Sequence, residues 1–203
     1  FLKVNDMSNI KKRTALVGAL LSLIATGQHF IMGTGAVFTS SAVIFLMPEK
    51  VYAGNEDFYL DKLDELYMEG ADPNRLIFYA NEILKINPRS GDAYWYRAYA
   101  KVEKGQYDDG IADYTKAIAL GVKDSMTFNN RAYAQEQIGD YNGAMSDYDS
   151  AIRKDRKNVY PYVNRAYLKQ TLGDIEGACF DWRKAFSLEP YEDLSEEIRN
   201  QCQ

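Results

Sequence analysis

A repeat with a period of 34 residues is the feature that most constrains this chain. The stretch "NRAYAQEQIGDYNGAMSDYDSAI" at 130–152 returns as "NRAYLKQTLGDIEGACFDWRKAF" at 164–186. The same step of 34 relates three glycines, Gly105, Gly139 and Gly173. A fixed period of this size is typical of stacked supersecondary units, none of which can bury its apolar face alone.

Each unit contains two segments with a helical pattern. In "DAYWYRAYAKVEKG" (92–105) and "YDDGIADYTKAIAL" (107–120), apolar residues recur three and four positions apart and do not alternate. That period predicts amphipathic α-helices. A glycine such as Gly105 follows the first segment, where positive φ ends a helix at low cost. We therefore expect an all-α fold built from helix pairs.

The repeated residues resemble those of tetratricopeptide repeats. The resemblance is carried by the period, the "GDY" and "KAI" motifs, and the aromatics Tyr94, Phe128 and Tyr162. It implies a right-handed superhelical solenoid of about four units within 54–203. The expected units are 57–90, 91–124, 125–158 and 159–192, with a capping helix at 193–203.

A polar pair recurs with the same period. In three copies an arginine is followed 16 residues later by an aspartate. The pairs are Arg97 with Asp113, Arg131 with Asp147, and Arg165 with Asp181. A buried arginine needs a partner, so we expect each pair to bridge the two helices of its own repeat. The alternative is that the arginines reach a carboxylate of a ligand.

The resemblance also implies a concave groove, lined by the first helix of each repeat, that binds an extended peptide or a protein segment. Phenol rings and amides suit that task, because they offer broad contact and paired hydrogen bonds. The candidate groove residues are Trp95, Tyr96, Tyr99, Asn129, Asn130, Tyr133, Val163, Asn164 and Tyr167. The alternative is that the tyrosines pack between neighbouring first helices.

One known ligand class of such repeats is not expected here. Repeats that bind the acidic tails of chaperones use a clamp of lysines, asparagines and an arginine. Asn130 matches one asparagine of that clamp, but the other slots hold no lysine or arginine. Those slots contain Trp95, Tyr99, Tyr160 and Asn164. We therefore predict no carboxylate clamp for chaperone tails.

Residues 1–53 have a different character. Residues 14–48 carry no fixed charge, and the basic run 11–13 precedes them, as at the start of a secretory signal. We predict either a signal peptide cleaved after Ala53 or an uncleaved membrane anchor, with the repeats in the periplasm or a lumen. A buried apolar helix packed on the repeats is the remaining alternative. An exported repeat protein of this style is similar to bacterial envelope or thylakoid assembly factors.

If the protein is exported, its two cysteines, Cys179 and Cys202, lie in a compartment where disulfides form and persist. Cys179 falls in the second helix of the last repeat, and Cys202 falls in the cap that should pack on that helix. A disulfide is therefore possible, although sequence alone does not bring the two Cα atoms within reach. The alternative is two unpaired thiols.

Charge and composition exclude several functions. The formal net charge is -5, and outside 1–53 the chain has 19 basic against 27 acidic side chains, which argues against nucleic-acid binding. His29 is the only histidine, and we find no motif for catalysis, a metal or a cofactor. The prediction is a non-enzymatic scaffold with a protein or peptide partner. The alternative is a structural solenoid that self-associates at the membrane.

Overall fold

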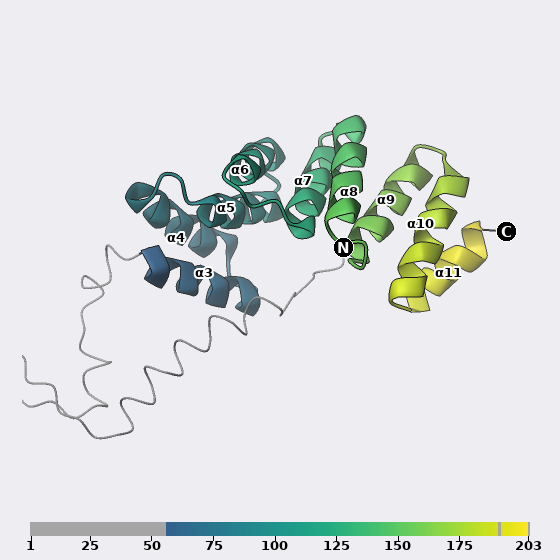
Figure 1. The fold of residues 1–203 in the computed structure, drawn as a ribbon, viewed down its shortest axis with the longest axis horizontal. Helices are drawn as coiled ribbons and strands as arrows, with labels where there is room; N and C mark the ends of the chain where they lie inside the picture. The colour runs from purple at the N-terminus through teal and green to yellow at the C-terminus, as the bar shows by residue number, and fades with distance from the viewer. Residues whose placement is uncertain (1–55, 191, 203) are drawn as a thin grey trace, which may run out of the picture. The chain divides into compact units, whose positions relative to one another are not determined.

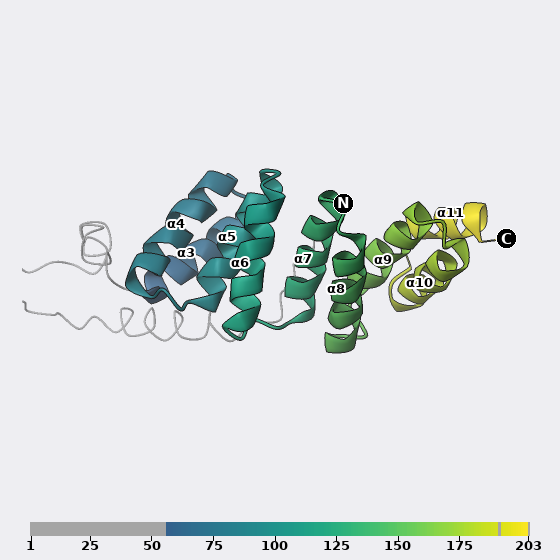
Figure 2. The same cartoon turned by 90° about the horizontal axis from the view of Figure 1, so that it is seen from above.

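The computed structural model describes residues 56–190 and 192–202. Over these residues the chain is all-α, as predicted. Four helix pairs follow one another and a further helix comes last (Figures 1 and 2). The pairs are α3 (Glu56–Glu69) with α4 (Pro73–Ile86), α5 (Gly91–Glu103) with α6 (Tyr107–Ala119), α7 (Ser125–Gln137) with α8 (Tyr141–Lys154), and α9 (Tyr160–Thr171) with α10 (Ile175–Leu188); α11 is Glu192–Gln201.

The pairs stack in a regular way. We call α3, α5, α7 and α9 the first helices, and α4, α6, α8 and α10 the second helices. Each second helix contacts its own first helix and the helix that follows it in the chain, which for α10 is α11. Each first helix also contacts the next first helix. The described chain is therefore a solenoid in which every repeat buries its apolar faces against its neighbours.

The "GD" motif fixes the turn within the third and fourth repeats. Gly139 and Gly173 have φ of 81° and 86°, a left-handed conformation that glycine adopts without a steric penalty. The following Asp140 and Asp174 then cap the second helices by accepting hydrogen bonds from backbone N–H groups at 3.0 and 2.9 Å. Two adjacent residues thus end one helix and begin the next.

Large and small side chains alternate in the core. Tyr114, Tyr148 and Trp182 occupy the same position in three successive second helices, and all three are fully buried. Small residues beside them let the helices approach closely. A Cβ added to Gly110 would lie 2.5 Å from the Cγ2 atom of Val102, so that position accepts only glycine without repacking.

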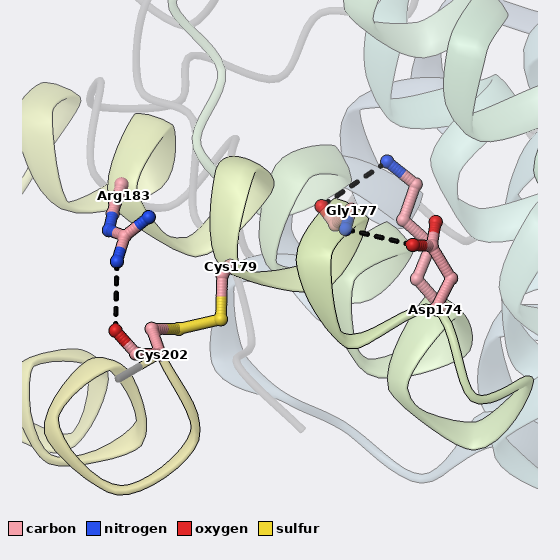
Figure 3. Close-up of a disulfide and its surroundings, with 6 residues drawn as sticks. Asp174, Gly177, Cys179, Arg183 and Cys202 are labelled. Atoms are coloured by element: carbon pink, nitrogen blue, oxygen red, sulfur yellow. Dashed lines mark hydrogen bonds between the residues drawn. A yellow bond between two sulfur atoms is a disulfide. The ribbon is translucent and has the colours of Figure 1, made fainter.

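The last helix, α11, closes the end of the solenoid. Leu194 is buried in the core cluster that contains Trp182. Cys179 of α10 and Cys202 form a disulfide whose Cα atoms are 5.5 Å apart (Figure 3). Beside it, Arg183 donates a hydrogen bond of 2.9 Å to the carbonyl oxygen of Cys202. Covalent and polar contacts therefore hold α11 on the last repeat.

The predictions of a signal peptide, an anchor or a packed apolar helix concern residues 1–53, which lie outside the described residues. Among the helices that are described, none is both long and apolar enough to cross a membrane.

Candidate partner-binding face

An aromatic cluster joins the first two repeats. Tyr67 of α3 lies edge-on to three rings of α5, with centroid distances of 5.4 Å to Trp95, 5.9 Å to Tyr96 and 4.9 Å to Tyr99. Trp95 and Tyr99 are stacked, with an interplanar angle of 7°. Such pairs contribute about 0.5–1.5 kcal/mol each beyond the area they bury. The predicted groove aromatics of α5 therefore pack against α3, and of the three only Tyr96 and Tyr99 remain partly accessible.

The nine predicted groove residues divide by exposure. Trp95, Asn129 and Val163 are buried, so they stabilise the core and are not available to a partner. The other six are accessible in part, and Tyr167 is the most open at 38%. The partly accessible residues are Tyr96, Tyr99, Asn130, Tyr133, Asn164 and Tyr167.

The predicted asparagines connect two first helices. The Nδ2 group of Asn164 on α9 donates to Oδ1 of Asn129 on α7 at 2.9 Å. Asn129 in turn donates to Oδ1 of Asn130 at 3.3 Å. These amides hold α7 and α9 together, so part of the hydrogen-bonding capacity that we assigned to a peptide backbone is used inside the protein.

Carboxylate side chains accept hydrogen bonds from two of the tyrosines and lie near others. The Tyr96 hydroxyl donates to Asp64 of α3, and the Tyr148 hydroxyl donates to Glu136 of α7 at 3.0 Å. Burial raises the pKa of Tyr67 and of Tyr99, and the negative charge of Glu103 raises both pKa values further. The tyrosines therefore stay protonated at neutral pH, beside negative charge.

We call this surface the tyrosine–carboxylate face. It is formed by Tyr67, Tyr96, Tyr99 and Tyr133 with Asp64, Glu103 and Glu136. Negative charge beside half-buried aromatic rings attracts cations and repels anions. The sequence did not point to the three carboxylates, because each occupies a different position within its repeat and only Glu103 recurs at the 34-residue step, as Glu69.

The predicted arginine–aspartate pairs lie within hydrogen-bonding distance in all three repeats. Nε of Arg97, Arg131 and Arg165 is 2.7–2.8 Å from Oδ2 of the aspartate 16 residues later, and Nη2 is 2.5–2.8 Å from Oδ1. Each pair is bidentate and joins the first and second helix of one repeat. The arginines are thus engaged within the fold, which leaves no support for the alternative that they reach a ligand.

Each arginine also reaches the preceding repeat, which the sequence analysis missed. Nη1 of Arg97 donates to Asn81 at 2.8 Å, and Nη1 of Arg131 donates to Thr115 at 3.0 Å. Arg165 contacts Asp149 in the same way. The signal was present, because these three partners also follow the 34-residue period. The arginines therefore connect neighbouring repeats as well as the helices within one.

Two lysines complete the ion pairs. Lys101 and Lys169 lie 2.8 Å from Oδ2 of Asp113 and Asp181, respectively. Burial alone would raise the pKa of Asp113, but hydrogen bonds from Arg97 and Lys101 outweigh it and hold that pKa below its ordinary value. In the third repeat the corresponding residue is Gln135, so Asp147 has one basic partner there.

The comparisons with known proteins concern the fold. No family model matches this chain, and no curated protein matches it. A crystal structure of MamA matches with a TM-score of 0.63 and 20% identity, covering 96% of this chain and 99% of MamA. The fold is TPR-like. The Arabidopsis OM64 TPR domain matches with a TM-score of 0.53 and 24% identity, over 56% of this chain and 94% of the domain.

A third TPR structure has a bound peptide. The first TPR of Spaghetti (RPAP3), bound to the HSP90 peptide SRMEEVD, matches with a TM-score of 0.53 and 24% identity, over 56% of this chain and 90% of that one. At these identities the likeness establishes the fold and no shared ligand. Within the described residues, no three potential ligand side chains gather into a metal site.

Proposed function

We propose that this protein is a non-enzymatic adaptor that binds an extended peptide or protein segment on its first helices. The observation that carries the proposal is the tyrosine–carboxylate face, in which half-buried tyrosines from successive repeats lie beside carboxylates. Aromatic side chains of this kind provide most of the binding energy in many protein interfaces. The TPR structure with a bound peptide supports the same use of the fold.

The partner differs in charge from the peptide seen in that structure. The sequence SRMEEVD contains three acidic residues near its end. In this chain the clamp slots on α5 hold Trp95 and Tyr99, and Arg131 of α7 is bound to Asp147. An acidic tail would therefore meet negative charge and no basic clamp.

We propose further that the adaptor works outside the cytoplasm, in a periplasm or lumen. Two observations support this location: the basic and apolar character of residues 1–53, and the disulfide between Cys179 and Cys202, a bond that persists in oxidising compartments. Mass spectrometry of thiol-blocked protein from cells tests it. A protein isolated with both cysteines alkylated would contradict the proposal.

The binding proposal is tested by affinity capture from membrane and soluble extracts. We compare the wild type with a Tyr133→Ala, Tyr167→Ala variant. The matched control is Phe78→Ala, Phe180→Ala, because these aromatics are exposed by 57% and 68% and lie on second helices. We expect the wild type and the control to retain a partner that the first variant loses, while circular dichroism shows that all three remain helical.

Two other results would contradict the adaptor. Equal recovery of the partner with all three proteins would place the binding site elsewhere. If no partner is captured and the mass in solution rises with concentration, the protein is instead a self-associating solenoid.

A further inference from the structure

The charges of α5, α7 and α9 are sorted between two sides of these helices. Every arginine and lysine of the three helices donates to an aspartate of a second helix. The contacts are Arg97 and Lys101 with Asp113, Arg131 with Asp147, and Arg165 and Lys169 with Asp181. The positive charge of these helices is therefore bound to the second helices, and none of these five side chains belongs to the tyrosine–carboxylate face.

Negative charge lies on the other side. Glu103, at the end of α5, is exposed and lies one helical turn after Tyr99, and its charge raises the pKa of Tyr67, Tyr99 and Tyr133 on three successive first helices. Glu136 accepts a hydrogen bond from Tyr148 and lies one turn after Tyr133 on α7. Tyr67, Tyr99 and Tyr133 pack against one core cluster, so these rings and carboxylates lie close together on α3, α5 and α7.

The protein itself shows how such a combination binds a cation. On the opposite side of α5, the guanidinium carbon of Arg97 lies 5.2 Å from the centroid of the Tyr94 ring while its nitrogens bond to Asp113. An aromatic ring and a carboxylate together hold that guanidinium. The tyrosine–carboxylate face offers the same two groups to a cation that a partner would supply.

Resting on the proposed function, we propose that the tyrosine–carboxylate face binds its partner segment through lysine or arginine side chains. The cations lie over the rings of Tyr99 and Tyr133, and Glu103 and Glu136 neutralise them. The partner is therefore a basic extended segment, opposite in charge to a chaperone tail.

Selection from a library of random 12-residue peptides tests this chemistry with the full chain. We expect the selected peptides to be enriched in lysine and arginine. The best of them, measured by fluorescence anisotropy, should bind a Glu103→Gln, Glu136→Gln variant roughly tenfold more weakly, since the loss of a close charge pair at an interface weakens binding by about that factor or more. Affinity should also fall between about 20 and about 150 mM NaCl, because the Debye length shortens over this range and screens the charges.

The control variant is Asp108→Asn, Glu176→Gln. This variant also loses two negative charges, but from exposed residues in the first turns of α6 and α10. We expect its affinity to change by less than about twofold, because surface charges far from a binding site act weakly. An equal loss in both variants would overturn a specific site and indicate general charge attraction.

Results that would overturn the cation proposal alone differ from results that would also overturn the adaptor. Neutral or acidic peptides whose binding still requires Tyr133 would overturn the cation proposal and leave the adaptor standing. Recovery of no peptide that depends on Tyr133, together with unchanged capture by the tyrosine variant, would overturn both. A dimer that Glu103→Gln dissociates would identify a second copy of this chain as the occupant and would likewise overturn the proposal.

Discussion

The two sides of the first helices carry different kinds of residue and have different roles. On one side, Arg97 and its repeats are bonded to partners that recur with the same period. On the other side, Glu136 has no counterpart, because Val102 and Gln170 stand 34 positions before and after it, and Glu103 recurs only as Glu69 of the first repeat. Side chains that are repeated together with their partners therefore build the solenoid, whereas the side on which we propose that a partner binds keeps the period only in part.

The largest loss of stability should come from removing the most buried carboxylate of the arginine–aspartate side. Asp181 is fully buried and holds both Arg165 and Lys169. Asp181→Ala leaves two cations without their carboxylate and should destabilise the fold by about 3–5 kcal/mol. Urea denaturation measures the loss. The control is Asp149→Ala, whose side chain is 43% exposed, and it should cost less than about 1 kcal/mol. Similar losses from both would contradict the assignment.

Removing the disulfide tests whether these ion pairs stabilise the last repeat without a covalent link. Cys179 and Cys202 are 23 residues apart, so their link restricts the unfolded chain. Cys202→Ser should lower the free energy of unfolding by about 2–4 kcal/mol. Denaturation of the variant beside the oxidised and reduced wild type measures this. A reduced wild type as stable as the oxidised protein would show that the ion pairs and α11 packing suffice.

The two sides should respond to pH in opposite directions. The pKa of Asp113 is lowered, so its contribution is present above its ordinary pKa of 3.8 and is lost as pH falls through the lower value in the folded protein. Asp113→Asn should therefore destabilise the protein most at neutral pH, by roughly 1–3 kcal/mol, and least in strong acid. Thermal unfolding across pH checks this. A penalty that is constant with pH would contradict it.

Glu136 provides the contrast on the tyrosine side. Burial raises its pKa above 4.5, although the Tyr148 hydrogen bond opposes the shift. Its stabilising contribution is therefore present below pH 4.5 and is lost as pH rises through the folded pKa. Glu136→Gln should be neutral or stabilising by less than about 1 kcal/mol at pH 7, and this advantage should disappear near pH 4. Destabilisation at pH 7 would assign Glu136 to the structural side.

The smallest change in stability should come from giving the third repeat the lysine that its two neighbours have. Gln135 stands where the neighbouring repeats have Lys101 and Lys169, and its Oε1 atom is buried with no hydrogen-bond partner among the described residues. Gln135→Lys should give Asp147 a second cation and stabilise the fold by about 0.5–1 kcal/mol. Chemical denaturation is precise enough to detect this. A loss of stability would mean that the third repeat is packed differently.

Sequence periodicity predicted the helix pairs and the arginine–aspartate spacing, because both depend on residues within one repeat. It did not predict the contacts between repeats. The ring contacts that Tyr67 makes with Trp95 and Tyr99 join the first two repeats, and Tyr67 does not recur at the 34-residue step, where Lys101 stands. The disulfide likewise depends on how α11 packs on α10, and no spacing rule fixes that packing.

The candidate face could be predicted only in part. The sequence identified Tyr99 and Tyr133 by their common step but could not show that Trp95, Asn129 and Val163 are buried. Periodicity reports a repeated environment and does not say whether that environment is core or surface. The carboxylates could not be found in this way, because Asp64 and Glu136 occur once each and Glu103 recurs only as Glu69.

Site-specific photo-cross-linking tests most directly whether the tyrosine side binds the partner. A photoreactive phenylalanine analogue replaces Tyr133 or Tyr167 in the full chain, and Phe78 or Phe180 in two controls. Irradiation in native extract should attach the same partner at positions 133 and 167, through segments rich in lysine and arginine, and should attach nothing at 78 or 180. Adducts at 78 or 180 with none at 133 and 167 would contradict the account.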